Sequence, residues 1–164
     1  MVQYRLEELR EEQLTNITEI YNHYVLHTTA TFHDHPIAIE EMKELVFFDN
    51  PKYKTFVITD DNNICGYAIL TQFKKREAYD GTAEVTVYLK PDYIRKGLGS
   101  LAVKYIEDIA KNSNIHVLVA IICGENHKSI KLFERNDYFK CAHYKEVGKK
   151  FGKLLDVVSY QKII

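Results

Sequence analysis

A carboxylate on an apolar strand is the first residue in this sequence that could do chemistry. Glu84 lies in the run AEVTVYL, where strand alternation places it on one face with Thr86 and Tyr88. A carboxylate on a largely covered strand needs a partner or a task, because burying its charge is costly. Burial also raises a carboxyl pKa toward neutral pH, which suits a general base. The alternative is a carboxylate at a solvated strand end.

Two glycines in the stretch RKGLGS, residues 95–100, are the second such feature. Gly97 and Gly99 stand at the start of a helical pattern, with Arg95 and Lys96 beside them. Glycine lets the backbone approach a ligand closely, and the free N–H groups and dipole of a helix start favour an anion. The stretch therefore predicts an anion site or, alternatively, an ordinary helix start after a loop.

Other phosphate-binding motifs fit this stretch less well. Residues 97–102 match the dinucleotide pattern G-x-G-x-x-A, but that pattern needs its first glycine directly after a strand, and residues 90–96 intervene. The chain is also too short for a dinucleotide domain plus a substrate domain, which disfavours a nicotinamide oxidoreductase. A Walker loop is excluded because no Gly-Lys-Ser/Thr occurs.

Alternating strands and helices must position these residues. The predicted helices are 11–27, 39–48, the stretch after residue 97, and 127–136. The predicted strands are 3–9, two arms of a hairpin over 53–73 with its turn at 60–63, 82–89, 115–123, 138–147 and 153–163. The order strand, helix, strand from 82 to 123 implies a parallel crossover. The class is α/β (α+β), with a mixed, mainly antiparallel central sheet of about seven strands and about four flanking helices.

Two of these segments carry more specific predictions. The nearly unbroken apolar run 115–123 is typical of a strand covered on both faces. The stretch GKKFG, residues 148–152, separates the last two strands and predicts a hairpin turn with solvated lysines.

Length, charge and cysteine usage limit the class of protein. The 164 residues are enough for one domain, 1–164, with its own core. A formal net charge of -1 argues against a nucleic-acid or membrane partner. Cys65, Cys123 and Cys141 are odd in number and widely spaced, which is typical of reduced thiols, and no signal-peptide pattern precedes them. The expected location is the cytoplasm.

Histidine pairs raise the question of a metal. His23 and His27 are four residues apart, and His33 and His35 are two apart. A metal site needs a third converging Cys, Asp or Glu at ligand spacing, and none is apparent, so no metal is expected.

Several motifs together resemble a known family. The stretches TAEVTVYLKPDYIRKGLGSLAVKYIE and NHKSIKLFERNDYF resemble the core of a GNAT-family N-acetyltransferase. IYNHYVLHTTATF, REAYDGTAEVTVYL and EVGKKFGKLLDVVSYQ resemble its phosphinothricin acetyltransferase branch. The resemblance covers nearly the whole chain.

This resemblance implies that the glycine loop binds the pyrophosphate of acetyl-CoA, with the pantetheine between splayed strands 82–89 and 115–122. The implied cofactor-binding residues are Val87, Tyr88, Leu89, Arg95, Lys96, Gly97, Leu98, Gly99, Ser100, Asn126 and Ser129. A backbone N–H among residues 87–89 would polarise the thioester carbonyl. Asn126 is also a good N-cap for the helix 127–136, and the two roles are compatible.

The resemblance also assigns Glu84 as the catalytic base, acting through water on the substrate ammonium. Arg76 on composition alone belongs to a solvated charge run, but the resemblance implies that it holds an acidic group of the substrate. The implied substrate-binding residues are Thr31, Phe32, Arg76, Tyr79, Thr86 and Phe151. Some relatives carry His at the position of Phe151.

Three positions depart from the family pattern. Ile94 stands where the family usually has Gln or Arg, so only its main-chain N–H can serve there. Phe133 replaces a Tyr that can protonate the leaving thiolate, which removes that general acid. Asp137 and Tyr138 replace the usual Gly-Phe, and we expect the turn to survive because Asp tolerates a left-handed conformation.

The sequence therefore predicts a cytoplasmic, acetyl-CoA-dependent N-acetyltransferase. It would transfer acetyl directly to the α-amine of a small amino acid or toxic analogue of the phosphinothricin, methionine sulfone or methionine sulfoximine type. No acetyl-enzyme is expected, because a carboxylate is a poor acyl carrier and no Cys sits in a nucleophile setting. The resemblance implies a homodimer. The alternative is a non-catalytic CoA-binding or sensing module of the same fold.

Overall fold

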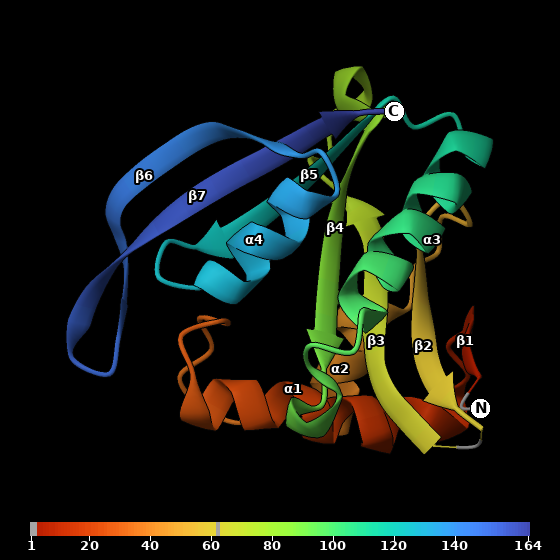
Figure 1. Ribbon diagram of the computed structural model, residues 1–164, viewed down its shortest axis with the longest axis horizontal. Coiled ribbons are helices and arrows are strands. Elements are labelled where there is room, and N and C mark those ends of the chain that lie inside the picture. The colour runs from red at the N-terminus through yellow and green to blue at the C-terminus, as the bar shows by residue number, and fades with distance from the viewer. Residues whose placement is uncertain (1–2, 62) are drawn as a thin grey trace.

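One mixed sheet carries the candidate residues. The computed structural model describes residues 3–61 and 63–164, and within them seven strands pair in the order β1-β2-β3-β4-β5-β7-β6 (Figure 1). The strands are β1 Tyr4–Glu8, β2 Lys54–Asp60, β3 Asn63–Gln72, β4 Thr82–Leu89, β5 Val117–Cys123, β6 Phe139–Lys150 and β7 Lys153–Ile163. The α-helices are α1 Leu14–His27, α2 Ile39–Val46, α3 Leu98–Asn112 and α4 His127–Arg135. Short 3₁₀ turns are η1 Glu11–Gln13, η2 Glu77–Tyr79 and η3 Pro91–Tyr93.

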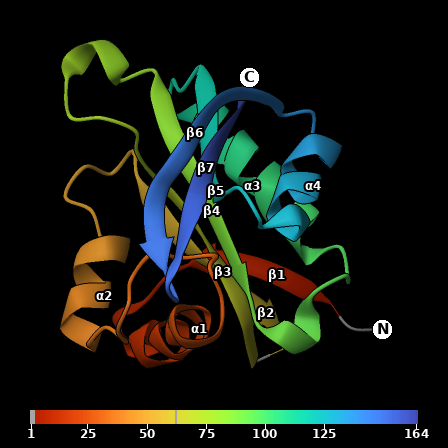
Figure 2. The ribbon, with the colours of Figure 1, turned by 90° about the vertical axis from the view of Figure 1, so that its left-hand side faces the viewer.

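The helices cover the sheet from both faces (Figure 2). Apolar residues of α3 and α4 pack with Phe56, Ile58 and Val85, whereas those of α1 and α2 pack with Val57 and Tyr67. Alternate residues of one strand thus enter different clusters, as the period of two requires. This arrangement confirms the predicted mixed sheet of seven strands and four α-helices.

The parallel pair β4 and β5 separates after a short contact. Their ladder joins Thr82–Glu84 to Val117–Val119 and goes no further, while β3 stays paired with β4 from Ala83 to Leu89. In Figure 1, β5 runs away from β4 below this point. The edge of β4 that faces β5 therefore keeps unpaired backbone groups beyond Glu84. The predicted parallel crossover is confirmed, and the splayed pair is present.

Two local predictions were wrong. The predicted turn 148–152 is shorter, because β6 continues to Lys150 and only Phe151 and Gly152 connect it to β7. The run 115–123 is not covered on both faces throughout, because Ile121 is 48% exposed.

Two predicted turns gave different outcomes. Asp137 has a φ of 68°, so the expected left-handed turn survives without glycine. In the predicted turn 60–63, Asp61 has a φ of 51°, and Asn62 lies outside the described residues.

Candidate active site

Glu84 lies on β4 at the last residue that pairs with β5. Its sheet neighbours on the same face are Thr71 of β3 and Val119 of β5. The side chain is half-buried, and in residues 3–61 and 63–164 it has no hydrogen bond or ion pair. Burial raises the pKa of the Glu84 carboxyl. A carboxylate with no structural partner and a raised pKa is suited to accept a proton at neutral pH.

Further along the same face, β4 joins a cluster of tyrosines. The Tyr88 ring lies 5.5 Å from Tyr21, 5.3 Å from Tyr24 and 5.4 Å from Tyr67 between ring centroids. Burial raises the pKa of Tyr88, so its hydroxyl stays protonated at neutral pH. The Tyr24 hydroxyl donates to the carbonyl of Leu89 at the end of β4. The cluster therefore braces the splayed end of β4 against α1.

A close approach of β3 also fixes this end of β4. A Cβ on Gly66 would lie 2.5 Å from the carbonyl oxygen of Tyr88, so only glycine fits here. Val87 packs toward the α3 face. The backbone of residues 87–89 is thus held in place with one edge open, as a site for an extended ligand chain requires.

Gly97 begins α3 in a conformation that suits an anion site. Its φ is 80°, and a Cβ there would meet nothing within 4 Å. The first helical bond runs from the N–H of Leu101 to Gly97 O at 3.1 Å, so the N–H groups of Leu98, Gly99 and Ser100 have no acceptor within the helix. These amides fit a pyrophosphate group, because they carry the positive end of the helix dipole.

Gly99 has a different task from Gly97. A Cβ at this position would lie 2.9 Å from Cδ1 of Leu132, which belongs to α4. Its absence lets α3 and α4 pack closely. The Ser100 hydroxyl accepts a hydrogen bond from Nδ2 of the buried Asn136 at 3.0 Å, so that side chain is also used in packing the two helices.

The charged pair before the glycines is solvated. Arg95 has a φ of 68°, and both Arg95 and Lys96 are exposed. The Lys96 ammonium lies 4.6 Å from the centre of the Tyr93 ring. Both side chains can approach a phosphate from solvent, and Lys96 would leave its contact with the Tyr93 ring to do so.

Asn126 is the N-cap of α4. Its Oδ1 accepts a hydrogen bond from the N–H of Ser129 at 3.2 Å, so the capping role is present. Asn126 is half-buried, and its Nδ2 donates to no acceptor within the described part of the chain. That amide can still donate to a ligand, as the resemblance implies.

Phe133, at the position where the family usually has a tyrosine, is a core residue. Its ring is buried and lies 5.0 Å from that of Tyr138 in an edge contact.

Three of the predicted substrate residues lie on the segment after α1 and on the β6–β7 hairpin that contacts it. Thr31 is buried, and its Oγ1 lies 2.5 Å from the hydroxyl of Tyr21, which also contacts Nδ1 of His33. Phe32 lies against Gly148 of β6. Phe151 is exposed at the tip of the β6–β7 hairpin.

Arg76 and Tyr79 lie at the opposite end of β4. Arg76 is exposed at the start of η2, and the Tyr79 ring lies 5.8 Å from that of Phe73. In Figure 1 the segment between β3 and β4 is at the top and the α1–α2 loop at the lower left. Thr86 lies between these ends, on the face of Glu84. The structure thus does not bring Arg76 and Thr31 together within one chain.

Sequence reasoning missed Lys150 and Tyr21 as parts of this region. Lys150 seemed to belong to a solvated turn, but it is 3% exposed and contacts the segment that holds Thr31. Tyr21 falls in the predicted helix 11–27, where no role in the site was predicted for it. Strand alternation through Lys149 and Lys150 was the available signal, since it would have turned one of the two inward.

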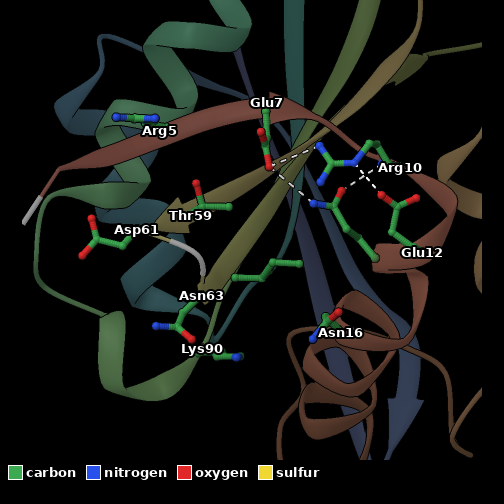
Figure 3. Close-up of a pocket in the computed structure, with 11 residues that line it drawn as sticks. Arg5, Glu7, Arg10, Glu12, Asn16, Thr59, Asp61, Asn63 and Lys90 are labelled. Carbon is green, nitrogen blue, oxygen red and sulfur yellow. Dashed lines mark hydrogen bonds and ion pairs between the residues drawn. The ribbon is translucent and has the colours of Figure 1, made fainter.

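A wide polar pocket lies elsewhere (Figure 3). Its volume is about 500 Å³, and β1, the start of α1 and the facing ends of β2 and β3 surround it. Arg10, one of its charged residues, pairs with Glu7 and Glu12. None of the predicted site residues lines it. We therefore do not place the reaction in this pocket.

No group of three or more His, Cys, Asp or Glu residues in 3–61 and 63–164 could hold a metal ion. In the same residues, no helix is both long and apolar enough to cross a membrane.

The fold and the family comparison define the class of the protein. Residues 6–138 match the model of the Acetyltransferase (GNAT) family, and the chain therefore belongs to that family. This confirms the resemblance stated from the motifs.

Individual relatives narrow the branch. A phosphinothricin N-acetyltransferase of Streptomyces coelicolor is 34% identical over 93% of this chain and 91% of its own. An L-methionine sulfoximine/L-methionine sulfone acetyltransferase of Salmonella typhimurium is 32% identical over 88% and 85%, respectively. The structure of a Sinorhizobium meliloti phosphinothricin acetyltransferase in complex with AcCoA superposes with a TM-score of 0.93 at 27% identity, over 98% of this chain and 88% of that one.

Proposed function

We propose that this protein is an acetyl-CoA-dependent N-acetyltransferase that acetylates the α-amine of a small amino acid or a toxic analogue. The analogues are of the phosphinothricin, methionine sulfone or methionine sulfoximine type. The names of the relatives support this substrate class. The observation that carries the proposal is Glu84, a half-buried carboxylate with a raised pKa at the point where β4 and β5 diverge.

Acetyl-CoA supplies an activated thioester, and the residues present fit it. The amides of residues 98–100 would bind its pyrophosphate, and the open edge of β4 would bind the pantetheine. A backbone N–H among residues 87–89 would stabilise the negative charge that develops on the carbonyl oxygen. Asn126 would donate its free amide group to the same chain.

Glu84 would prepare the amine for attack. A substrate ammonium has no lone pair, so it must lose a proton before it can attack a carbonyl carbon. Glu84 would accept that proton through a water molecule. The amine nitrogen would then bond to the acyl carbon and lose its second proton to solvent as the carbon–sulfur bond breaks. Because Phe133 has no acidic proton to give, the departing thiolate would take its proton from solvent.

Arg76 would bind the acidic group of the substrate. Its guanidinium is exposed and forms no ion pair within the described residues, so it is available to a carboxylate. Arg76→Ala should raise the KM for the amino acid far more than that for acetyl-CoA. Equal increases would contradict this role.

The proposed function is tested by release of free CoA thiol in the presence of an amine panel. The panel would contain common amino acids, phosphinothricin, methionine sulfone and methionine sulfoximine. We expect turnover with a subset of these amines and loss of it in Glu84→Gln. Binding of acetyl-CoA without turnover on any amine would instead support the CoA-sensing alternative.

We also propose that the protein is a homodimer of the cytoplasm. Ile121, Phe139 and Tyr144 expose apolar surface on the β5–β7–β6 face that lacks a helix (Figure 2). A second copy could cover this face. Size-exclusion chromatography with light scattering would test it, and Ile121→Glu should shift the protein toward monomer. The three free cysteines fit a reducing compartment.

A further inference from the structure

Lys150 is a buried lysine at the end of β6. It is 3% exposed, whereas its neighbour Lys149 is exposed and the Lys153 side chain is 55% exposed. Burying an ammonium group is costly unless hydrogen bonds or charges compensate for the lost water. The position of Lys150 therefore needs an explanation that its neighbours do not.

The ammonium group of Lys150 is bound to a distant backbone group. Its Nζ donates to the carbonyl oxygen of Thr31 at 2.7 Å, across 119 residues of sequence. No carboxylate within the described part of the chain lies close enough to pair with it. A hydrogen bond from a charged donor in a buried setting is stronger than a neutral one. Lys150 thus links β6 to the residues that follow α1 through a buried hydrogen bond.

The same two segments meet at a second point. A Cβ on Gly148 would lie 2.4 Å from Cε2 of Phe32, so the ring packs directly on the backbone of β6. Residues 29–32, here called the acceptor loop, therefore pack against the last residues of β6. Any side chain at position 148 would move Phe32.

A third contact reaches the acceptor loop from β5 and β7. Glu125, just after β5, accepts a hydrogen bond from Oγ1 of Thr29 at 2.6 Å and pairs with Nζ of Lys153 at 2.8 Å. These groups are exposed, so the contact is weaker than that of Lys150. The buried contact through Lys150 therefore dominates.

Tyr21 connects the acceptor loop to the face of β4 that carries Glu84. Thr31 Oγ1 lies 2.5 Å from the Tyr21 hydroxyl, and the Tyr21 ring packs edge-on against Tyr88 of β4. Tyr88 shares its face with Glu84. A shift of the acceptor loop would change the space in front of β4 without moving Glu84.

We propose that Lys150 is a positioning residue that holds the acceptor loop against β6 and so sets the space open to the amine. It acts on amine binding, through Thr31 and Phe32, and not on the acetyl-CoA site or the proton transfer. This inference rests on the proposed function for its kinetic consequences. The contact between Lys150 and the acceptor loop does not depend on that function.

The test compares Lys150→Met with Lys150→Arg and with Lys149→Met, an exposed matched control. Hydrogen–deuterium exchange of a peptide spanning residues 28–35 measures the loop directly, and kcat and both KM values are measured by thiol release. In Lys150→Met we expect faster exchange in this peptide and an amine KM raised by about tenfold, since charged hydrogen bonds of this kind contribute enough free energy for such a change. Lys150→Arg should restore part of both effects, and Lys149→Met should show neither.

Several results would overturn the inference. Unchanged exchange in residues 28–35 would show that Lys150 does not hold the loop. Faster exchange with equal rises in both KM values would show a general structural role. If Lys150→Met does not fold, Gly148→Ala displaces Phe32 without removing a charge, and an unchanged amine KM there would count against the inference. Turnover by the wild-type protein on no amine would reject the proposed function instead, while the exchange result would still decide whether Lys150 holds the loop.

Discussion

The proposed cofactor side of the site and its proposed acceptor side are built from contacts of different range. On the cofactor side, Asn126 caps an amide three residues away, and Gly97 accepts from an amide four residues away. On the acceptor side, Lys150 reaches across 119 residues to Thr31, and Thr29 reaches across 96 residues to Glu125. Local contacts form wherever the helix start forms, whereas the long-range ones exist only in the completed sheet. We therefore expect substitutions on the two sides to have different effects on activity and stability.

Glu84 stands between the two sides, and its removal should have the largest effect. Glu84→Gln should lower kcat by about 10²–10⁴-fold, the usual contribution of a positioned general base, with the KM for acetyl-CoA nearly unchanged. Thiol release at saturating acetyl-CoA measures this. Glu77→Gln, an exposed carboxylate close by in sequence, is the control. Turnover that survives in Glu84→Gln would remove the base from the scheme.

Gly99 and Gly97 have different roles: Gly99 allows helix packing, and Gly97 allows the backbone to approach a ligand. Gly99→Val should lower stability by about 1–3 kcal/mol, because the new side chain overpacks against Leu132. The double variant Gly99→Val/Leu132→Ala should recover part of the loss. Gly97→Ala should also destabilise, by about 1–2 kcal/mol from its positive φ, but without rescue at Leu132. Thermal unfolding of these three variants and of Gly97→Ala/Leu132→Ala checks this, and equal rescue of both glycine variants would contradict it.

The cap of α4 should give a smaller effect. Asn126→Ala should cost about 1 kcal/mol of stability through loss of the hydrogen bond to Ser129, while Asn126→Asp should keep the cap. Asn126→Asp also removes the free amide group. A raised acetyl-CoA KM in this variant would support the proposed contact with the pantetheine, and an unchanged KM would leave Asn126 as a cap alone.

The raised pKa of Glu84 predicts a stability effect that is opposite in sign to the activity effect. The folded protein holds the Glu84 proton to a higher pH than the unfolded chain, so the contribution of this group is full below the unfolded pKa and is lost as pH rises through the folded pKa. Glu84→Gln should therefore gain stability relative to wild type as pH rises from about 4 to 7. Urea titrations at the two pH values measure the difference. A gap that narrows over this range would contradict the assignment.

Most of the local geometry on the proposed cofactor side could be predicted from the sequence. The helix start at Gly97 and the Asn126 cap depend on neighbouring residues, and the period-two pattern placed Glu84, Thr86 and Tyr88 on one face. The role of Gly99 could not be predicted, because its reason is Leu132 on another helix. The exposure of Ile121 was missed for a similar cause, since an apolar run does not reveal which face of the sheet has a helix over it.

The sequence by itself determined the family, the element order and which residues of a strand share one face, because these depend on periodicity and on local motifs. Only the tertiary structure decided that Lys150 is buried while Lys149 is not, and that Arg76 and Thr31 lie at opposite ends of β4. The physical reason is that burial of a charge depends on which distant group lies opposite it. For Lys150 that group is a backbone carbonyl, which no residue type in the sequence identifies.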